Sequence, residues 1–235
     1  MLTREIDKAL YESYSDDIPQ LLKKIYAARS VTESQLSMAL PGLLKPSFDQ
    51  LHIALDLLQN CIEEDRRILI VGDFDADGAT ASVVAIKALR SMGAKYVDFL
   101  VPNRFKHGYG LSPEIVNEAK AEKEPNLIIT VDNGISSNEG AALARSLGID
   151  VIITDHHLPP KVLPDANAII NPNLRGCDFP SKNLAGVGVC FYLFSSLKTH
   201  LDSIGYFEKN NIKVPDFREL LDLVALGTVA DVVKL

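Results

Sequence analysis

The feature that most constrains the fold is a series of short apolar segments that alternate with helical patterns. These segments are typical of buried strands, and a helical pattern follows most of them. Strands and helices that alternate at this spacing form βαβ units. The sequence therefore predicts an α/β domain with a mainly parallel β-sheet and helices on both faces. The strands are expected at residues 67–72, 96–101, 127–131, 151–154 and 168–170.

The first third of the chain shows helical patterns alone. Apolar residues recur at helical spacing between residues 19 and 29, and again between residues 51 and 62. No repeat and no low-complexity linker separates this part from the strands. We therefore expect a helical N-terminal arm over residues 1–66 and the sheet domain over residues 67–235.

The apolar segments, the N-terminal sequence and the cysteine spacing indicate the cellular compartment in which this protein is expected. No window approaches 18 consecutive apolar residues, so no membrane-spanning helix and no membrane partner are expected. The N-terminal segment is charged and lacks the apolar core of a secretory signal. The three cysteines, at positions 61, 177 and 190, form no CxxC pair. This spacing favours a reducing compartment and argues against a structural zinc site. We expect a cytoplasmic protein.

Acidic and imidazole side chains directly follow three of the predicted strands. Parallel strands end at one edge of a sheet, where ligands bind. Acids gathered there repel one another and raise one another's pKa, and a bound cation removes that conflict. Carboxylates with imidazoles suit Mn²⁺ or Mg²⁺, and several shared acids indicate two ions. The candidates are Asp73, Asp75 and Asp77 after the first strand, Asp132 after the third, and Asp155, His156 and His157 after the fourth.

The DFDADG segment at 73–78 also has other interpretations. By itself it could be a solvated turn. An EF-hand loop would place acids at the same first positions, but its twelfth residue would be Glu where this chain has Val84, and a strand rather than a helix precedes it. An aspartyl-phosphate phosphatase also has a strand that ends in DxD. That alternative gives no role to the DHH triplet after the fourth strand.

Two glycine-containing loops are candidates for binding phosphate or DNA. The first carries Arg104, Lys106 and His107 after the second strand, and arginine is suited to bidentate phosphate binding. An ordinary surface turn would explain it equally. The second contains Gly186 and Gly188 before a predicted helix, where backbone amides can receive an anion. Close helix packing is its alternative explanation.

Four motifs, in this order, resemble those of the DHH phosphoesterases. They are DFDADG at 73–78, VDNG at 131–134, DHH at 155–157 and LGTVADV at 226–232. The segments VPNRF, GYGLSPE and AIINPN are similar to those of the exonucleases specific for single-stranded DNA within this family. The similarity extends over essentially the whole chain.

The resemblance implies a two-metal phosphodiesterase that uses Mn²⁺ or Mg²⁺. Its expected activity is 5′ to 3′ degradation of single-stranded DNA to 5′-mononucleotides, in DNA repair and recombination. It implies that His157 faces the scissile phosphate, that Arg104 contacts a phosphate and that Asp73 supports one ion. Asp231 is assigned by the resemblance alone, and Asp222 is its nearest competitor. The implied metal ligands are Asp75, Asp77, Asp132 (bridging), His156 and Asp231.

Single-stranded DNA is thus the expected partner, with other DNA-repair proteins as further candidates. The formal net charge of −7 would normally disfavour a nucleic-acid partner, but two bound divalent cations would offset more than half of it. One alternative is a DHH phosphodiesterase for short oligonucleotides, cyclic dinucleotides or pyrophosphate, and another is a non-catalytic interaction module. The resemblance is to a catalytic half, so we expect the DHHA1 and oligonucleotide-binding domains to lie outside this chain.

Overall fold

The computed structural model describes residues 4–36 and 43–234, apart from the side chain of Arg104. It contains two compact units, Met1–Lys45 and Pro46–Leu235. In the first unit, Tyr14 is buried, its ring meets that of Tyr26 edge to face, and its hydroxyl donates to the carbonyl oxygen of Val31. The helices of this unit are α1 (Lys8–Ser13), α2 (Gln20–Ala27) and the 3₁₀ helix η1 (Glu33–Leu36).

The second unit is built on a five-stranded, fully parallel sheet in the order β2-β1-β3-β4-β5. Every residue of β1 and β3 is buried, as expected for central strands that are covered on both faces. Long apolar side chains, many of them β-branched, fill these strands. The strands are β1 (Ile68–Gly72), β2 (Val97–Leu100), β3 (Leu127–Val131), β4 (Asp150–Thr154) and β5 (Ala168–Ile170).

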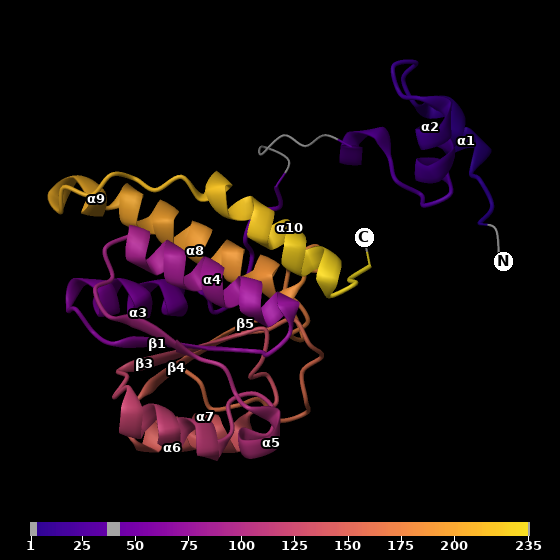
Figure 1. Cartoon of the computed structure of the whole chain (residues 1–235). Helices are drawn as coiled ribbons and strands as arrows, with labels where there is room; N and C mark the ends of the chain where they lie inside the picture. The colour runs from indigo at the N-terminus through magenta and orange to yellow at the C-terminus, as the bar shows by residue number, and fades with distance from the viewer. Residues whose placement is uncertain (1–3, 37–42, 235) are drawn as a thin grey trace. The chain divides into compact units, whose positions relative to one another are not determined.

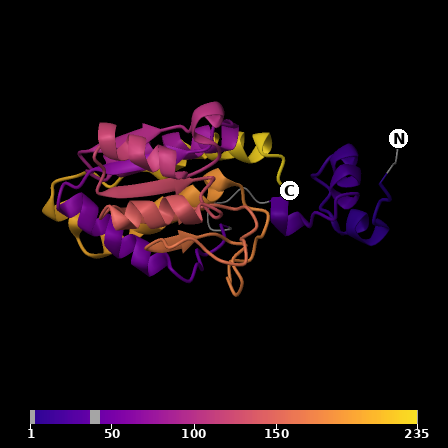
Figure 2. The same cartoon turned by 90° about the horizontal axis from the view of Figure 1, so that it is seen from below.

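Helices cover both faces of this sheet (Figures 1 and 2). Helices α3, α4, α8 and α10 lie on one side, and α6 and α7 lie on the other (Figure 1). The two sides have separate cores, because alternate strand residues point to opposite faces. The helices are α3 (Leu51–Glu63), α4 (Ala76–Ser91), α5 (Arg104–His107), α6 (Pro113–Glu122), α7 (Asn138–Ser146), α8 (Gly186–Ser203), α9 (Tyr206–Lys209), η3 (Phe217–Leu220) and α10 (Leu221–Ala230).

This architecture confirms the predicted fold class, an α/β domain with a parallel sheet and helices on both faces. In the part of the chain that the structure describes, no helix has the length and apolar character needed to cross a bilayer.

The division between the units differs from the boundary expected near residue 66. It falls between Lys45 and Pro46, so helix α3 belongs to the sheet unit. The reason is the apolar face of α3: Ala54 and Leu58 are fully buried in the same core as α4 and α8. This burial ties α3 to the sheet unit.

Helix α4 begins at Ala76, inside the acidic motif that follows β1. Asp75 caps it, since its carboxylate accepts a hydrogen bond from the backbone amide of Gly78 at 2.9 Å. The first turn of α4 therefore holds Asp77 rigidly, instead of leaving it in a turn.

Candidate functional site

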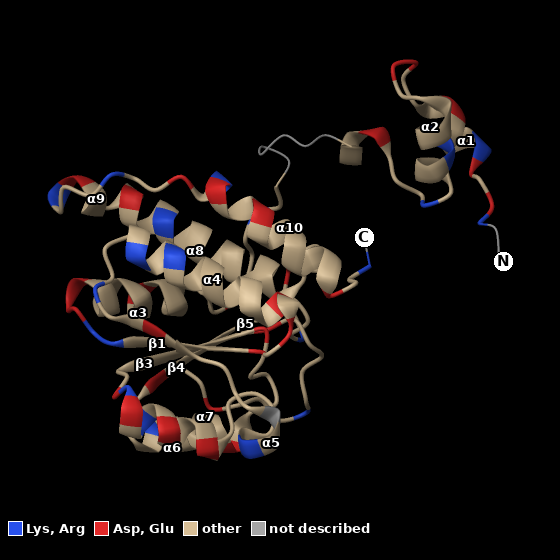
Figure 3. Cartoon of the chain, viewed as in Figure 1, with Lys and Arg blue, Asp and Glu red and all other residues tan. Residues whose placement is uncertain are grey.

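Three neighbouring strands deliver acidic residues to one edge of the sheet. Asp73 follows β1, Asp132 follows β3 and Asp155 follows β4, and these strands are adjacent in the sheet. All three side chains are buried. Asp132 has φ +61°, so the chain turns sharply where β3 ends. Acidic residues also lie near this edge where α4 begins (Figure 3). The edge is the one at which ligands bind in open parallel sheets.

Asp77 is held by the first turn of another helix. Its carboxylate oxygens accept hydrogen bonds from the backbone amides of Gly186 at 2.6 Å and Val187 at 2.8 Å, where α8 begins. Burial raises the pKa of Asp77 even though these two hydrogen bonds act in the opposite direction. A carboxylate beside the N-terminus of α8 also interacts favourably with the helix dipole.

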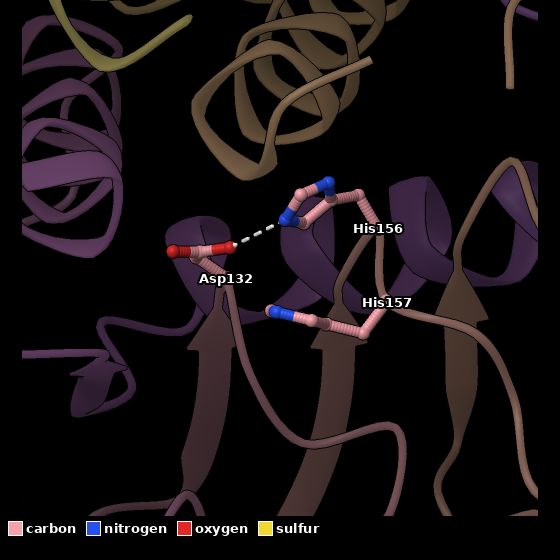
Figure 4. Close-up of side chains that lie close together, drawn as sticks. All are labelled: Asp132, His156 and His157. Atoms are coloured by element: carbon pink, nitrogen blue, oxygen red, sulfur yellow. Dashed lines mark ion pairs between the residues drawn. The ribbon is translucent and has the colours of Figure 1, made fainter. Parts of the chain in front are cut away.

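The centre of the site is the pair Asp132 and His156 (Figure 4). Oδ1 of Asp132 lies 3.2 Å from Nε2 of His156, and both atoms are buried. Neither atom has a hydrogen-bond partner among the described residues. Burial raises the pKa of Asp132 to about 7, against the opposing effect of His156. Burial alone would lower the pKa of His156, but the neighbouring Asp132 carboxylate raises it.

Asp231 joins this pair from the far end of the chain. It caps the C-terminal end of α10, and its Oδ2 lies 3.6 Å from Nε2 of His156. The competitor Asp222 lies in the first turn of the same helix, is exposed, and accepts a hydrogen bond from the amide of Leu223. Helix α10 packs along α4 and α8, and this packing brings its last turn to the site. Local sequence patterns alone could not identify Asp231.

His157 has a different environment from His156. Its Nδ1 lies 2.7 Å from Oδ1 of the buried Asp155, and this contact raises the pKa of His157 to about 9. Burial would raise the pKa of Asp155, but hydrogen bonds from His157 and from backbone amides outweigh that effect and lower it. The pair thus holds a cationic imidazole beside an ionised carboxylate. About half of the His157 side chain is exposed, so its ring can meet a ligand.

Tyr109 completes this side of the site. Its ring meets the ring of His157 edge to face, and its hydroxyl lowers the pKa of Asp73 against the larger effect of burial, which raises it. Burial and the neighbouring acids raise the pKa of the phenol. Sequence reasoning did not single out this residue, although its GYG segment was part of the resemblance.

The donor atoms fall into three overlapping groups. Within each group the potential ligand atoms lie within 4.8 Å of one another. Asp132 and His156 each belong to two groups, which fits a pair of ions with shared ligands. Carboxylate oxygens with imidazole nitrogens suit Mn²⁺ and Mg²⁺. A cation would also give a partner to Oδ1 of Asp132 and Nε2 of His156, the two buried atoms that have no hydrogen-bond partner among the described residues. The groups are Asp73, Asp75 and Asp132; Asp77, His156 and Asp231; and Asp132, His156 and His157.

The residues after β2 that were predicted to contact phosphate are Arg104 and His107. The side chain of Arg104 lies outside the described part of the structure, so its role stays a prediction. His107 is buried: its Nδ1 accepts from the amide of Asn103, and its Nε2 lies 3.0 Å from Glu118. Lys106 pairs with the same glutamate at 2.8 Å. We therefore correct the prediction that His107 contacts phosphate, because its ring is enclosed by its own loop and α6.

The structure gives Gly186 a contact other than phosphate. The start of α8 does receive an anion, but that anion is the carboxylate of Asp77, which uses the backbone amide of Gly186. A Cβ on Gly188 would meet the side chain of Leu184 at 2.5 Å, so this glycine serves helix packing. The amide of Gly186 is therefore already used by Asp77, and a phosphate contact of Gly188 stays a prediction.

A cavity of about 690 Å³ opens beside His157. Its lining includes Tyr109 and Asp155, and also Ser137 and Asn138 at the start of α7. Its volume lies in the range of small-molecule sites. The acidic cluster therefore adjoins a space large enough for part of a substrate.

Comparison with known proteins identifies relatives of the whole chain. The single-stranded-DNA-specific exonuclease RecJ of Escherichia coli (strain K12) is 53% identical over 234 residues, which cover 99% of this chain and 40% of that protein. The RecJ of Bacillus subtilis (strain 168) is 45% identical over 77% of this chain and 21% of its own length. The chain thus spans less than half the length of these relatives.

Two solved structures of RecJ also match this chain. RecJ in complex with Mn²⁺ from Thermus thermophilus matches with a TM-score of 0.67 at 30% identity, over 95% of this chain and 29% of that one. An exonuclease RecJ bound to manganese matches with a TM-score of 0.64 at 34% identity, over 79% and 44%. The family model for the N-terminal domain of the DHH family matches residues 67–228. That stretch contains the parallel sheet and all three acidic strand ends, and by this match the chain belongs to the DHH family.

Proposed function

We propose that this chain forms the catalytic centre of a metal-dependent exonuclease that degrades single-stranded DNA from 5′ to 3′ and releases 5′-mononucleotides. The observation that carries the proposal is the buried pair Asp132 and His156, whose facing atoms lie 3.2 Å apart without hydrogen-bond partners among the described residues. Relatives named as single-stranded-DNA-specific exonucleases support the choice of substrate.

The proposed metal ligands follow from the overlapping groups. Asp77, His156 and Asp231 would hold one ion, and Asp73 and Asp75 would hold the other. Asp132 would bridge, because it lies with Asp73 and Asp75 and also beside His156. Two bound divalent ions would neutralise the charge that develops on the phosphoryl oxygens during cleavage. Mn²⁺ and Mg²⁺ are the proposed ions, supported by the solved relatives that hold Mn²⁺.

His157 would act on the substrate directly. Its Nδ1 faces Asp155, so Nε2 is the ring atom left for a ligand. Because the contact with Asp155 raises the pKa of His157 to about 9, the ring carries a proton on Nε2 at neutral pH. A cationic donor at this place would bind a non-bridging oxygen of the scissile phosphate. Asp155 then has two functions, since it orients the ring and keeps it charged.

The cavity beside His157 would receive the nucleoside attached to that phosphate. Its lining includes the polar residues Ser136, Asn138 and Glu139. Glu139 and Asp155 disfavour a second phosphate there, whereas hydroxyl and amide groups suit a sugar or a base. Arg104, by the resemblance, would contact a further phosphate of the strand.

A strand-degradation assay tests the proposal. The chain, at high concentration with Mn²⁺, is incubated with a labelled single strand, the matching duplex, a dinucleotide and a cyclic dinucleotide. We expect 5′-mononucleotides from the single strand, released from its 5′ end, and no products from the Asp132→Asn variant. Cleavage of the small substrates alone would favour the alternative phosphodiesterase. Absence of both cleavage and Mn²⁺ binding would favour a non-catalytic module.

The cellular setting remains part of the proposal. Degradation of single strands would serve DNA repair and recombination in the cytoplasm, together with other repair proteins. The support for this setting is the relationship to exonucleases specific for single-stranded DNA. Localisation of a tagged chain and co-purification after DNA damage would test it.

A further inference from the structure

Two asparagines after strand β5 bind the backbone of the DHH triplet. Asn171 is buried, and its Nδ2 donates to the carbonyl oxygen of His157 at 2.9 Å. Nδ2 of Asn173 donates to the carbonyl oxygen of His156 at 2.5 Å. The backbone amide of Asn173 also donates to Oδ1 of Asn171 at 2.7 Å, which links the side chain of Asn171 to the backbone of Asn173. Adjacent carbonyls of the histidine pair are thus each held by one amide.

The opposite groups of the same two residues are held by Asp155. Its Oδ1 accepts from the backbone amide of His156 at 2.7 Å and from that of His157 at 3.0 Å. Three side chains therefore bind both amides and both carbonyls of the histidine pair. A dipeptide held at all four polar backbone groups has little freedom to rotate, so these contacts fix the backbone positions from which the two imidazoles extend.

The Asn-Pro-Asn segment at residues 171–173 is itself held in place by hydrogen bonds near it in the fold. Nζ of Lys182 donates to the carbonyl oxygen of Pro172 at 2.6 Å and to that of Cys177 at 2.8 Å. The backbone amide of Asp155 donates to Ile170, the last residue of β5, at 3.1 Å. The two asparagines are therefore fixed relative to the sheet. Their hydrogen bonds to the histidine carbonyls fix the backbone of the two histidines relative to the sheet as well.

We propose that Asn171 and Asn173 are positioning residues: Asn173 sets metal affinity through His156, and Asn171 sets turnover through His157. This inference rests on the proposed function. The division follows from the donated hydrogen bonds, because Nδ2 of Asn173 donates to the residue whose ring faces Asp132, and Nδ2 of Asn171 donates to the residue whose ring would face the phosphate. Groups that orient metal ligands in this way typically change affinity or activity about 10–100-fold.

The test removes each donor without changing size. Asn173→Asp and Asn171→Asp replace an amide that donates with a carboxylate that cannot. We expect Asn173→Asp to raise the Mn²⁺ dissociation constant about 10-fold or more. Free Mn²⁺ would be measured by electron paramagnetic resonance. Since an added negative charge by itself would tighten Mn²⁺ binding, a weaker affinity identifies lost positioning. Asn173→Ala, which adds no charge, should weaken binding as well.

Asn171→Asp should behave differently. We expect its Mn²⁺ affinity to stay within about twofold of the unmodified chain, while kcat falls about 10-fold or more at saturating Mn²⁺. The substrate would be the p-nitrophenyl ester of thymidine 5′-phosphate, which needs no strand channel. If an aspartate variant fails to fold, the alanine variant at the same position, which also lacks the amide donor, carries the same comparison.

Asn167→Asp is the matched control. Nδ2 of Asn167 donates to Oδ1 of Asp150 at 2.9 Å, at the end of the sheet opposite the site. This variant loses a bond of the same kind, so it should lower Tm without changing Mn²⁺ affinity or kcat. If the Asn171 and Asn173 variants show that same pattern, both residues are merely structural and the inference is overturned.

Two outcomes separate this inference from the proposed function. If the unmodified chain binds no Mn²⁺, the proposed function fails whatever the variants do. If it binds Mn²⁺ and Asn173→Asp binds it equally well, the inference alone fails. A double variant sharpens the second case: Asn173→Asp added to His156→Ala should cause no further loss of affinity, since the asparagine acts through that histidine.

Discussion

The carboxylate of Asp77 accepts a hydrogen bond from the backbone amide of Gly186, 109 positions later in the chain, at 2.6 Å. The same glycine also approaches another acid of the site. A Cβ placed on Gly186 would lie 2.4 Å from Oδ1 of Asp132. Both carboxylates are about 1% exposed. The start of α8 is thus packed against two proposed metal ligands with no room for a side chain.

Gly186→Ala should therefore disrupt the site. The new methyl group would displace Asp132 or push α8 away from Asp77, and we expect Mn²⁺ affinity to fall about 10-fold or more, as for other changes that misplace metal ligands. Gly188→Ala is the control, because its Cβ would meet Cδ1 of Leu184, the end of a flexible side chain. Calorimetric titration with Mn²⁺ measures both. Equal affinities in the two variants would contradict this account of Gly186.

The stability of the metal-free chain should fall as pH rises from 6 to 9. Burial raises the pKa of Asp132 from 3.8 to about 7, and Asp155 raises that of His157 from 6.5 to about 9. Each group binds its proton more tightly in the folded state, so the stabilisation is complete at low pH and is lost as pH passes the folded pKa. Thermal unfolding in the presence of a chelator checks this. Saturating Mn²⁺ should restore Tm at pH 8, since ligands of the folded state stabilise it.

Asp132→Asn should abolish hydrolysis and yet stabilise the metal-free chain at pH 8. The substitution removes a buried carboxylate whose ionised form is disfavoured by burial and by Asp77. It should also reduce the decline of Tm between about pH 4 and 7, the interval between the unfolded and folded pKa values of Asp132. Asp222→Asn, on the exposed start of α10, is the control and should change neither property. A marked drop in the Tm of the metal-free Asp132→Asn variant would show that Asp132 has a structural role instead.

His157→Gln should lower kcat about 100-fold and leave Mn²⁺ affinity within a few-fold, if the ring acts on the phosphate as a charged donor. His156→Gln should instead weaken Mn²⁺ binding, because its ring faces Asp132 and Asp231. Measuring both quantities in both variants separates the two roles. A loss of Mn²⁺ affinity in His157→Gln as large as that in His156→Gln would assign His157 to the metal.

Binding of single-stranded DNA should depend only shallowly on salt. Lys106 is paired with Glu118, and His107 is buried, so the described loop after β2 offers few free cations. The slope of log affinity against log salt is about −0.7 per neutralised phosphate. With about two or three phosphates neutralised, we expect a slope near −2 or shallower. Fluorescence anisotropy over a salt series measures it, and a slope of about −4 or steeper would show that this chain carries the strand channel by itself.

The sheet was predictable from local patterns. Each of the five strands lies within one residue of the range expected from its apolar run. Central strands of a parallel sheet are buried on both faces, so their sequences are nearly continuous apolar runs. Such a run can be recognised without knowing which strands lie beside it in the sheet. The parallel arrangement in turn made the acidic motifs informative, since the ends of such strands meet at one edge.

Tertiary packing decided the rest of the site. Asp231 reaches His156 because α10 lies along α4 and α8, and the amide of Gly186 is used by Asp77 because α8 begins beside α4. Helix α3 joined the sheet unit for a similar reason, the burial of its apolar face. Local patterns were enough to predict the strands, their order along the chain and the acids that follow them. Contacts between residues a hundred positions apart depend on how whole helices pack, and a pattern over a few neighbouring residues contains no record of that packing.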